Sequence, residues 1–449
     1  MTDLKKKWVG VVGMGETGLA VADYLSRQGT RVLAYDKRAF EALPEDERRR
    51  WEALEHVEMR TGHEKANVLD GVDHIIVSPG VPGSIVPIER QREKGVPVWS
   101  EVELASQCIH APIMGVTGTN GKSTTVTLLG KLLQAAGWET FVGGNLGPPL
   151  ITACDSEYEQ YVVELSSYQL EETEMFRPHV AILLNISADH LDRYAGVEAY
   201  AAAKARMFMR MLPDDIAILN ADDPLVQSVA PTVPQVWHWS TQQPVSLGAY
   251  ADERGLHFVT PAAVFTVLRD DIALKGKHNE ENVMAAVLGA LTSGVTPGLI
   301  REVLRHFKGL PHRVEFVREY RGARYFDDSK GTNLGALSAA LSGFTEPVVL
   351  IAGGVDKGGD YAEVVDALKE HVRSVVVLGE AAPAIRKAWE KVVPVTAAES
   401  MADAVQQAAA QTQVGDVVLL SPACSSFDMF RDYKERGRVF QAAVHALFD

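Results

Sequence analysis

Short runs rich in β-branched residues alternate with amphipathic helical stretches along most of the chain. This alternation is typical of parallel sheets with crossover helices, so the pattern predicts an α/β fold. The predicted strands fall in three groups: residues 8–12, 31–35, 74–77 and 96–98; then 112–116, 161–164, 180–185, 216–220 and a β-rich stretch over 236–268; and finally 348–352, 374–378 and 417–420.

These groups predict three domains, over residues 1–100, 101–309 and 310–449. A helix over residues 279–291 closes the second group, and Gly294 beyond it is a typical helix stop. The length of 449 residues agrees with three domains of about 150 residues each.

The composition narrows the classes of partner. The chain has 44 lysines and arginines against 59 aspartates and glutamates, a formal net charge of −15, which disfavours unspecific attraction to nucleic acid or an anionic membrane. Cys108, Cys154 and Cys424 are widely spaced, odd in number and without metal-ligand spacing. They indicate a reducing compartment and neither a disulfide framework nor a zinc site.

The N-terminus imitates a secretory signal, because three lysines precede an apolar run and a small-residue segment at 20–22. Glu16 and the glycines around it interrupt that run and favour a strand, a tight turn and a helix. No window reaches the ~18 to 20 uncharged apolar residues of a spanning helix. We therefore expect a cytoplasmic protein that does not insert into membranes.

The first candidate site is the sequence GMGETG over residues 13–18, between a predicted strand and a predicted helix. Asp36 ends the next strand about 20 residues later, as a dinucleotide fingerprint requires. The pattern indicates a bound nucleotide diphosphate without saying which one. A tight turn that binds nothing remains the alternative.

The second candidate site is TGTNGKST over residues 117–124, which follows a predicted strand and opens an apolar-faced helix ending near Gly137. Backbone N–H groups, Lys122 and the Ser123 hydroxyl are the groups that a phosphate loop uses for phosphates and Mg²⁺. Val116 stands where the literal P-loop pattern has glycine. A chance G-K-S before a helix is the alternative.

Further candidates follow downstream strands. Glu164 ends one strand and His190 follows the next, so a parallel sheet would bring both to the edge that carries the phosphate loop. That edge suits Mg²⁺ ligation, although a surface carboxylate and an ordinary histidine remain open. Lys204 lies in an alanine-rich helical run, for which a solvated helix face is the default interpretation.

Six segments resemble, in the same order, the Mur ligases, the ATP-dependent enzymes that assemble the peptide of bacterial cell-wall precursors. They are TGTNGKS at 117–123, ELSSYQLE at 164–171, DHLDR at 189–193, KHNxxN at 277–282, PHR at 311–313 and DDSKGTN at 327–333. Within that family, the loop at 13–18, ELSSYQLE and SPACSSFD at 421–428 resemble the members that add D-glutamate. The D-N-P-R motif of the diaminopimelate-adding members is absent.

The resemblance implies a Rossmann-like N-terminal domain for a UDP-sugar, a central P-loop ATPase-like domain with a parallel sheet plus a small β region, and a Rossmann-like C-terminal domain that binds D-glutamate and closes on ATP. It implies ligation of D-glutamate to UDP-N-acetylmuramoyl-L-alanine through an acyl phosphate, in peptidoglycan precursor synthesis, with ATP and Mg²⁺. We expect a monomer.

The resemblance also implies roles for single residues. Lys122, His190 and Lys204 would be catalytic, with Lys204 carbamoylated, and Ser123, Glu164, His190 and Lys204 would hold or neighbour the metal ions. The implied ATP contacts are Gly118, Thr119, Asn120, Gly121, Lys122, Ser123, Thr124, Asn279, Asn282, Arg313 and Asp328. The implied UDP-sugar contacts are Gly15, Thr17, Asp36, Lys37, Arg38, Ser78, Gly80 and Asn145. The implied D-glutamate contacts are Lys330, Thr332, Lys357, Ser426, Phe427 and Tyr433.

Two of the D-glutamate positions depart from the family pattern. Tyr433 stands where an apolar aromatic residue is expected, and the run GGVDK at 353–357 allows a shift that would give the role of Lys357 to Asp356.

Three other classes remain open from the sequence. A nicotinamide-dependent dehydrogenase would use the loop at 13–18 but leaves Lys122 unexplained. A P-loop regulatory module would hydrolyse nucleotide without an amino acid. A folylpolyglutamate synthase would lack the UDP-sugar loop.

Overall fold

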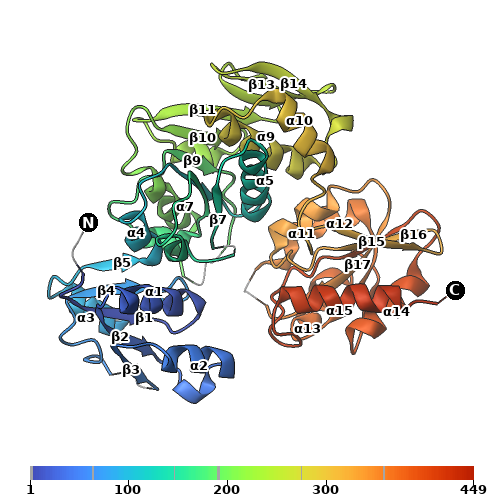
Figure 1. Cartoon of the computed structure of the whole chain (residues 1–449). Coiled ribbons are helices and arrows are strands. Elements are labelled where there is room, and N and C mark those ends of the chain that lie inside the picture. Colours follow the sequence, from blue (N-terminus) through green and yellow to red (C-terminus); the bar gives the residue numbers. More distant parts are fainter. Residues whose placement is uncertain are drawn as a thin grey trace. The chain divides into compact units, whose positions relative to one another are not determined.

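The computed structural model describes residues 4–62, 65–145, 147–189, 193–274, 276–356 and 359–448. The chain has the predicted α/β fold, with three sheets covered by helices (Figure 1). It forms two compact units, one made of residues 1–186, 193–269 and 281–303 and the other of residues 187–192, 270–280 and 304–449. The domain boundaries near residues 100 and 309 stay predictions.

The first sheet has five parallel strands in the order β3-β2-β1-β4-β5. Because β2 and β4 flank β1 on opposite sides, the carboxyl ends of β1 and β4 form a topological switch point, where ligands bind in such sheets. The strands are β1 (Trp8–Val12), β2 (Arg31–Asp36), β3 (Val57–Thr61), β4 (His74–Val77) and β5 (Val98–Ser100). The helices are α1 (Glu16–Arg27), η1 (Phe40–Ala42), α2 (Glu45–Glu52), α3 (Val86–Arg92) and α4 (Glu101–Ser106).

The second sheet has nine strands in the order β14-β13-β12-β11-β10-β9-β6-β8-β7. Its strands are parallel up to β12, and β13 and β14 add antiparallel, so the predicted β-rich stretch extends the same sheet. The strands are β6 (Ile113–Thr117), β7 (Thr140–Gly144), β8 (Gln160–Glu164), β9 (Val180–Leu183), β10 (Ile216–Asn220), β11 (Gln235–Ser240), β12 (Gly248–Ala251), β13 (Gly255–Val259) and β14 (Val264–Leu268). The helices are α5 (Lys122–Ala135), η2 (Leu150–Ala153), α6 (Ser167–Glu171), α7 (Val197–Ala205), η3 (Arg206–Phe208), α8 (Pro224–Ser228), η4 (Arg269–Asp271), α9 (Lys277–Thr292) and α10 (Pro297–His306).

One apolar core runs through the first two sheets. It includes Leu25 and Trp99 from the N-terminal segment together with Leu150 and Tyr161 from the central segment. Burial of apolar side chains stabilises a fold by roughly 25 cal/mol per Å², so a continuous core holds these two sheets in one compact unit.

The third sheet has six strands in the order β15-β16-β20-β17-β18-β19, all parallel except the β15–β16 hairpin. Val348 and Leu350 face one core cluster and Val349 and Ile351 face another, which explains why β17 is apolar throughout. The strands are β15 (Glu315–Tyr320), β16 (Ala323–Asp327), β17 (Val348–Gly353), β18 (Val372–Leu378), β19 (Val395–Ala397) and β20 (Val417–Leu420). The helices are α11 (Leu334–Leu341), η5 (Tyr361–Val364), α12 (Val365–His371), α13 (Ala382–Trp389), α14 (Met401–Gln411) and α15 (Tyr433–His445).

Several predicted elements shift at their ends. The strand predicted over 96–98 lies two residues later, at Val98–Ser100. Val96 is not part of it, because its N–H bonds the Gln91 carbonyl at the end of α3. The strand predicted over 180–185 ends at Leu183. The helix predicted over 279–291 is confirmed inside α9.

The sequence pattern missed the β15–β16 hairpin. Its two-residue turn at Arg321 and Gly322 has φ values of 49° and 76°, as a type I′ turn requires. An Arg-Gly pair is a weaker turn signal than Asn-Gly, so the hairpin was not apparent from the residues. Among the described residues, every helix is too short or too polar to span a bilayer.

Candidate active site

The phosphate loop lies at the centre of the second sheet, between β6 and α5. β6 pairs with both β8 and β9, so residues after its carboxyl end meet the ends of two neighbouring strands. The N–H groups of Thr119 and Asn120 bond the carbonyl and side-chain oxygens of Asn185 at 2.9 and 2.8 Å. Gly121 has a φ of 85° and no room for a Cβ, which would lie 2.1 Å from Oδ1 of Asn282.

The remaining residues predicted to contact ATP are divided between the two compact units. Ser123 and Thr124 are buried in the first turn of α5, and Asn282 lies beside them, where its Oδ1 accepts from Thr125 at 3.3 Å. Asn279 stands one turn before Asn282 on α9. Asn279 belongs to the second unit, as do Arg313 and Asp328.

Two lysines converge on the phosphate loop. Lys122 Nζ donates to the carbonyls of Gly118 and Thr119 at 2.7 Å, and Lys204 Nζ donates to the Gly118 carbonyl at 3.1 Å. Lys204 is only 1% exposed and its Nζ lies 4.2 Å from the centre of the Tyr200 ring. The solvated-face interpretation of Lys204 is therefore wrong, because the alanine-rich run points this side chain inward.

Glu164 lies at the end of β8, beside the phosphate loop. Its side chain is buried, which excludes the surface-carboxylate alternative, and its Oε1 accepts from Asn145 Nδ2 at 2.8 Å. The other oxygen, Oε2, is buried without a hydrogen-bond partner among the described residues. A buried carboxylate oxygen left unsatisfied fits a cation-binding role. His190 lies outside the described residues, as does Lys357.

A cavity of about 810 Å³ opens at the switch point of the first sheet and extends to the loop after β7. Its lining includes all eight residues that the resemblance assigns to the UDP-sugar, which are Gly15, Thr17, Asp36, Lys37, Arg38, Ser78, Gly80 and Asn145. Gly18 is required by packing, since a Cβ there would lie 1.9 Å from the Gly13 carbonyl oxygen. Nothing lies within 4 Å of a Cβ at Gly15, so this glycine leaves open space at the start of α1.

Asp36 is engaged by the protein itself. Its carboxylate accepts from the Met14 N–H at 2.9 Å and from the Arg38 guanidinium at 2.8 and 3.1 Å. Burial opposes ionisation, yet the hydrogen bonds from Arg38 and Met14 hold the pKa of Asp36 below its ordinary value. Asp36 thus shapes the loop and orients Arg38 at the cavity.

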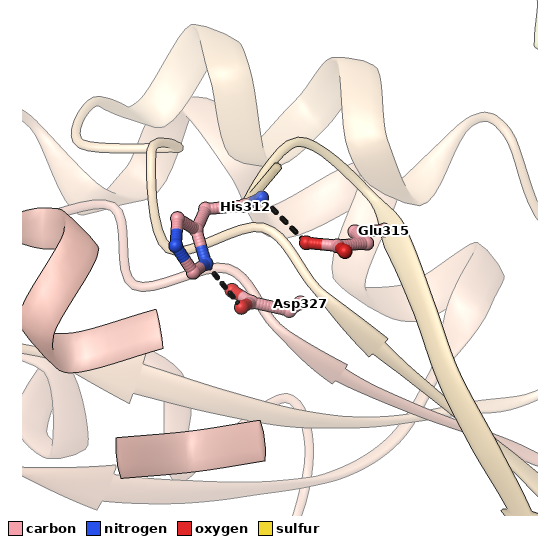
Figure 2. Close-up of side chains that lie close together, drawn as sticks. All are labelled: His312, Glu315 and Asp327. Carbon is pink, nitrogen blue, oxygen red and sulfur yellow. Dashed lines mark hydrogen bonds and ion pairs between the residues drawn. The ribbon is translucent and has the colours of Figure 1, made fainter. Parts of the chain in front are cut away.

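In the second unit, His312 links the start of β15 to the end of β16 (Figure 2). The ring nitrogen Nδ1 of His312 lies 2.6 Å from Oδ2 of Asp327. The backbone N–H of His312 donates to Glu315 Oε2 at 2.8 Å. Gln441 Nε2 donates to both carboxylates, at 3.0 and 2.9 Å. The three side chains have metal-ligand spacing, but protein donors already engage their facing atoms, so we interpret the group as a structural clamp.

The clamp adjoins the residues predicted to contact ATP and D-glutamate. Asp328 is buried, which raises its pKa to about 7, and its Oδ2 accepts from Ser421 at 2.8 Å. Lys330 donates its N–H to the His312 carbonyl at 3.1 Å, and its Nζ lies 4.2 Å from the centre of the Tyr433 ring. The structure therefore brings Lys330 and Tyr433 together.

The other described residues of the predicted D-glutamate set differ in exposure. Thr332 donates its N–H to the Lys330 carbonyl at 2.8 Å, Ser426 is buried, and Phe427 is 74% exposed. Asp356, the alternative to Lys357, lies next to the bridge between Val355 and Ser425.

Comparison with known proteins matches the chain to three family domains. They are the Mur ligase MurD-like N-terminal domain over residues 7–100, the Mur ligase middle domain over 116–290 and the Mur ligase glutamate ligase domain over 312–424. The chain belongs to the Mur ligase family. It is therefore a ligase of an ATP-dependent family.

Curated relatives cover essentially the whole chain. The UDP-N-acetylmuramoylalanine--D-glutamate ligase of Geotalea daltonii is 43% identical over 448 residues, 99% of this chain and 98% of its own length. That of Koribacter versatilis is 40% identical over 451 residues, 99% of this chain and 98% of its own length.

Solved structures share the fold. The UDP-N-acetylmuramate-alanine ligase of Thermotoga maritima has a TM-score of 0.60 at 17% identity, covering 98% of this chain and 99% of that one. A pseudomurein peptide ligase from Methanothermus fervidus also has a TM-score of 0.60, at 18% identity, covering 92% of this chain and 96% of that one.

Nothing in the sequence indicated that two arginines of this Mur ligase, Arg436 and Arg193, contact segments of the candidate sites. Arg436, 2% exposed, donates to the carbonyls of Ser329, Cys424 and Ser425 at 2.8 to 3.2 Å and so joins two predicted ligand-binding motifs. Burial lowers its pKa to about 10. Arg193 is the last residue of the DHLDR segment, and the resemblance to the family implies no role for it. An arginine on a helix or loop resembles a solvated one until its tertiary contacts are known.

Proposed function

We propose that this chain joins D-glutamate to the L-alanine carboxyl group of UDP-N-acetylmuramoyl-L-alanine and converts ATP to ADP and phosphate. The cavity at Gly15 carries the proposal, because every residue expected to hold the UDP-sugar lines it and Asn145 connects it to Glu164. The full-length similarity to relatives named for this reaction supports the same substrates.

In the proposed reaction, an oxygen of the alanine carboxylate attacks the γ-phosphorus of ATP. The bond from that phosphorus to the bridging oxygen breaks, ADP leaves, and an acyl phosphate forms. The D-glutamate amine then attacks the acyl carbon and loses a proton, and the tetrahedral intermediate expels phosphate as the amide forms. Positioning and electrostatic stabilisation dominate the first step, since charge accumulates on the phosphoryl oxygens.

Lys122 and the loop N–H groups are suited to bind those oxygens, because the ammonium and the start of α5 lie at the same loop. Glu164 and Ser123 would hold Mg²⁺, with His190 and Lys204 beside it by resemblance. When bound, Mg²⁺ neutralises phosphate charge. The unsatisfied Oε2 of Glu164 is the observation that favours this ion.

Lys330, Thr332, Ser426 and Lys357 are proposed to bind the side-chain carboxylate of D-glutamate, with Phe427 and Tyr433 around it. The backbone N–H of Lys330 bonds the His312 carbonyl, and its Nζ lies over the Tyr433 ring. These contacts orient Lys330 before the ligand binds. We also propose that the reaction takes place in the cytoplasm. We propose a monomer as the active form, and size-exclusion chromatography would test this oligomeric state.

The test is ATP-dependent phosphate release with the UDP-sugar substrate and a panel of amino acids. A site built to bind a second carboxylate rejects analogues that lack it by up to about 10⁴-fold, so D-glutamate should far exceed D-alanine and L-lysine. Equal turnover with L-lysine would overturn the assignment. Phosphate release that needs no amino acid would instead indicate a P-loop regulatory module.

A further inference from the structure

The thiols of Cys108 and Cys154 lie together, although the two residues are far apart in the sequence. Cys108 follows α4 and Cys154 follows η2. Their Sγ atoms lie 3.8 and 3.6 Å from the carbonyl oxygens of Leu104 and Ala105, two neighbouring residues at the end of α4. The two thiols are near enough for each to affect the pKa of the other.

The surroundings make the two thiols unequal. The neighbouring Cys154 thiol lowers the pKa of the Cys108 thiol despite its partial burial, and the Tyr24 hydroxyl, 3.1 Å from Cys108 Sγ, lowers it further. The Cys108 thiol, together with burial, raises the pKa of the Cys154 thiol. Cys108 is therefore the more readily ionised of the two thiols, as a nucleophilic cysteine beside a resolving one requires.

Accessibility distinguishes this pair from the third cysteine. Cys108 and Cys154 are both half-buried, so a small oxidant can reach them. Cys424 is buried, its Sγ lies 3.4 Å from the Tyr361 hydroxyl, and burial raises its pKa to about 11. Cys424 is consequently expected to be unreactive and provides an internal control.

We propose that Cys108 and Cys154 form a peroxide-reactive dithiol that closes to an intramolecular disulfide. The Cys108 thiolate attacks one oxygen of hydrogen peroxide, the O–O bond breaks, and Cys108 becomes a sulfenic acid while the other oxygen leaves as hydroxide, which takes a proton from solvent to give water. The Cys154 sulfur then attacks the Cys108 sulfur, its proton leaves with the sulfenic hydroxyl as a second water, and the S–S bond forms. Two thiols lose two electrons and one peroxide gains them.

The proposed bond would join α4 to η2, which pack against each other in the core shared by the first two sheets. η2 directly follows the loop whose Asn145, Gly147 and Pro149 line the cavity. Oxidation would thus restrain the segment that leads out of the proposed UDP-sugar site. The chemistry itself rests on the two thiols and does not depend on which substrate the cavity binds.

The test is treatment of the reduced full-length chain with hydrogen peroxide, followed by thiol counting after denaturation and by peptide mapping without reductant. Three free thiols should fall to one, the map should contain a Cys108–Cys154 linked peptide with Cys424 unmodified, and dithiothreitol should restore all three. Retention of three thiols, or linkage between separate chains, would overturn the proposal. The map of the unsubstituted chain decides this even if a variant fails to fold.

Variants assign the order of events. Cys108→Ser should slow oxidation of the remaining pair member by at least about tenfold, because the reactive thiolate is lost. Cys154→Ser should stop at a sulfenic acid on Cys108 that dimedone traps. Cys424→Ser is the matched control and should form the disulfide at the unaltered rate. Rapid disulfide formation that involves Cys424 in the unsubstituted chain would contradict the assignment.

Discussion

The side-chain amide of Asn145 donates a hydrogen bond to Oε1 of Glu164 across 2.8 Å. Asn145 lines the cavity of the first unit, and Glu164 ends the strand beside the phosphate loop. A second bond, from the Asn145 N–H to the Glu164 carbonyl at 2.9 Å, fixes the backbone as well. One residue thus connects the proposed UDP-sugar site to the proposed cation site.

Replacement of Asn145 by alanine should raise the Mg²⁺ concentration needed for half-maximal ligation by about 10- to 100-fold. Groups that orient a metal ligand have effects of this size, since the carboxylate loses its fixed orientation. Titration of activity with Mg²⁺ checks it. Ser84→Ala, which also alters the cavity lining, is the control, and an unchanged Mg²⁺ requirement in Asn145→Ala would contradict the coupling.

Lys122→Ala should reduce ligation by on the order of 10³-fold and leave the fold intact. The ammonium donates to the carbonyls of Gly118 and Thr119 in the phosphate loop, so its positive charge lies where phosphate oxygens would bind. Phosphate release measures the activity and a thermal melt measures the fold. Lys131→Ala, an exposed change on the same helix, should retain activity, whereas loss of cooperative melting in Lys122→Ala would point to a structural role.

Arg193→Met should raise KM for the UDP-sugar by about tenfold with little change in KM for ATP. Arg193 forms an ion pair with Glu171, stacks 4.0 Å from the centre of the Tyr168 ring and donates to the Pro79 carbonyl at 3.2 Å. Loss of a charge-assisted hydrogen bond costs about 1.5 to 3 kcal/mol, and Pro79 lines the cavity.

The matched control is Arg210→Met, because Arg210 also donates to one carbonyl, that of Glu174, at 2.7 Å, but away from the cavity lining. Steady-state kinetics with each substrate varied in turn separates the two constants. A parallel rise of both KM values in Arg193→Met would argue against a positioning role at the UDP-sugar site.

The clamp between His312 and Asp327 should make stability depend on pH. The hydrogen bond to Asp327 raises the pKa of His312, and burial opposes this. The stabilisation is therefore complete below the unfolded pKa of about 6.5 and is lost as pH rises through the higher folded pKa. His312→Asn should melt lower than the unsubstituted chain by on the order of 2 °C near neutral pH or below, with a smaller gap in alkaline buffer.

Thermal melts across that pH range measure the gap. The exposed His306→Asn change should leave melting unaltered at every pH. A gap in His312→Asn that stays constant from acid to alkaline buffer would show that ionisation of this histidine does not contribute.

Lys204→Ala should remove most of the activity, and formate or acetate should restore part of it. If the buried ε-amine becomes a carbamate, its charge changes from positive to negative beside the cation, and a small carboxylate could occupy the emptied space. Activity assays with and without formate, and ¹³C NMR of the unsubstituted chain under labelled CO₂, check this. Full activity of Lys204→Ala in CO₂-depleted buffer would refute the carbamate.

The sequence alone determined those features of this protein that depend on residues adjacent in the chain. Both nucleotide loops were predicted because a strand, a glycine-containing turn and a helix start are encoded within a few residues. The apolar run at 348–352 likewise predicted a strand, and the structure shows that this strand, β17, contacts one core cluster on each face. The β15–β16 hairpin escaped because its turn residues have no strong local preference for positive φ.

Only the tertiary structure decided which distant side chains meet. Strand order brings Asn145 to Glu164, and the packing of α4 against η2 brings Cys108 to Cys154. The alanine-rich sequence around Lys204 predicts a solvated helix face. The packing of α7 instead buries Lys204 at the Gly118 carbonyl. Such contacts depend on how whole elements pack, because a side chain's neighbours are fixed by the shared core and not by adjacent residues in the chain.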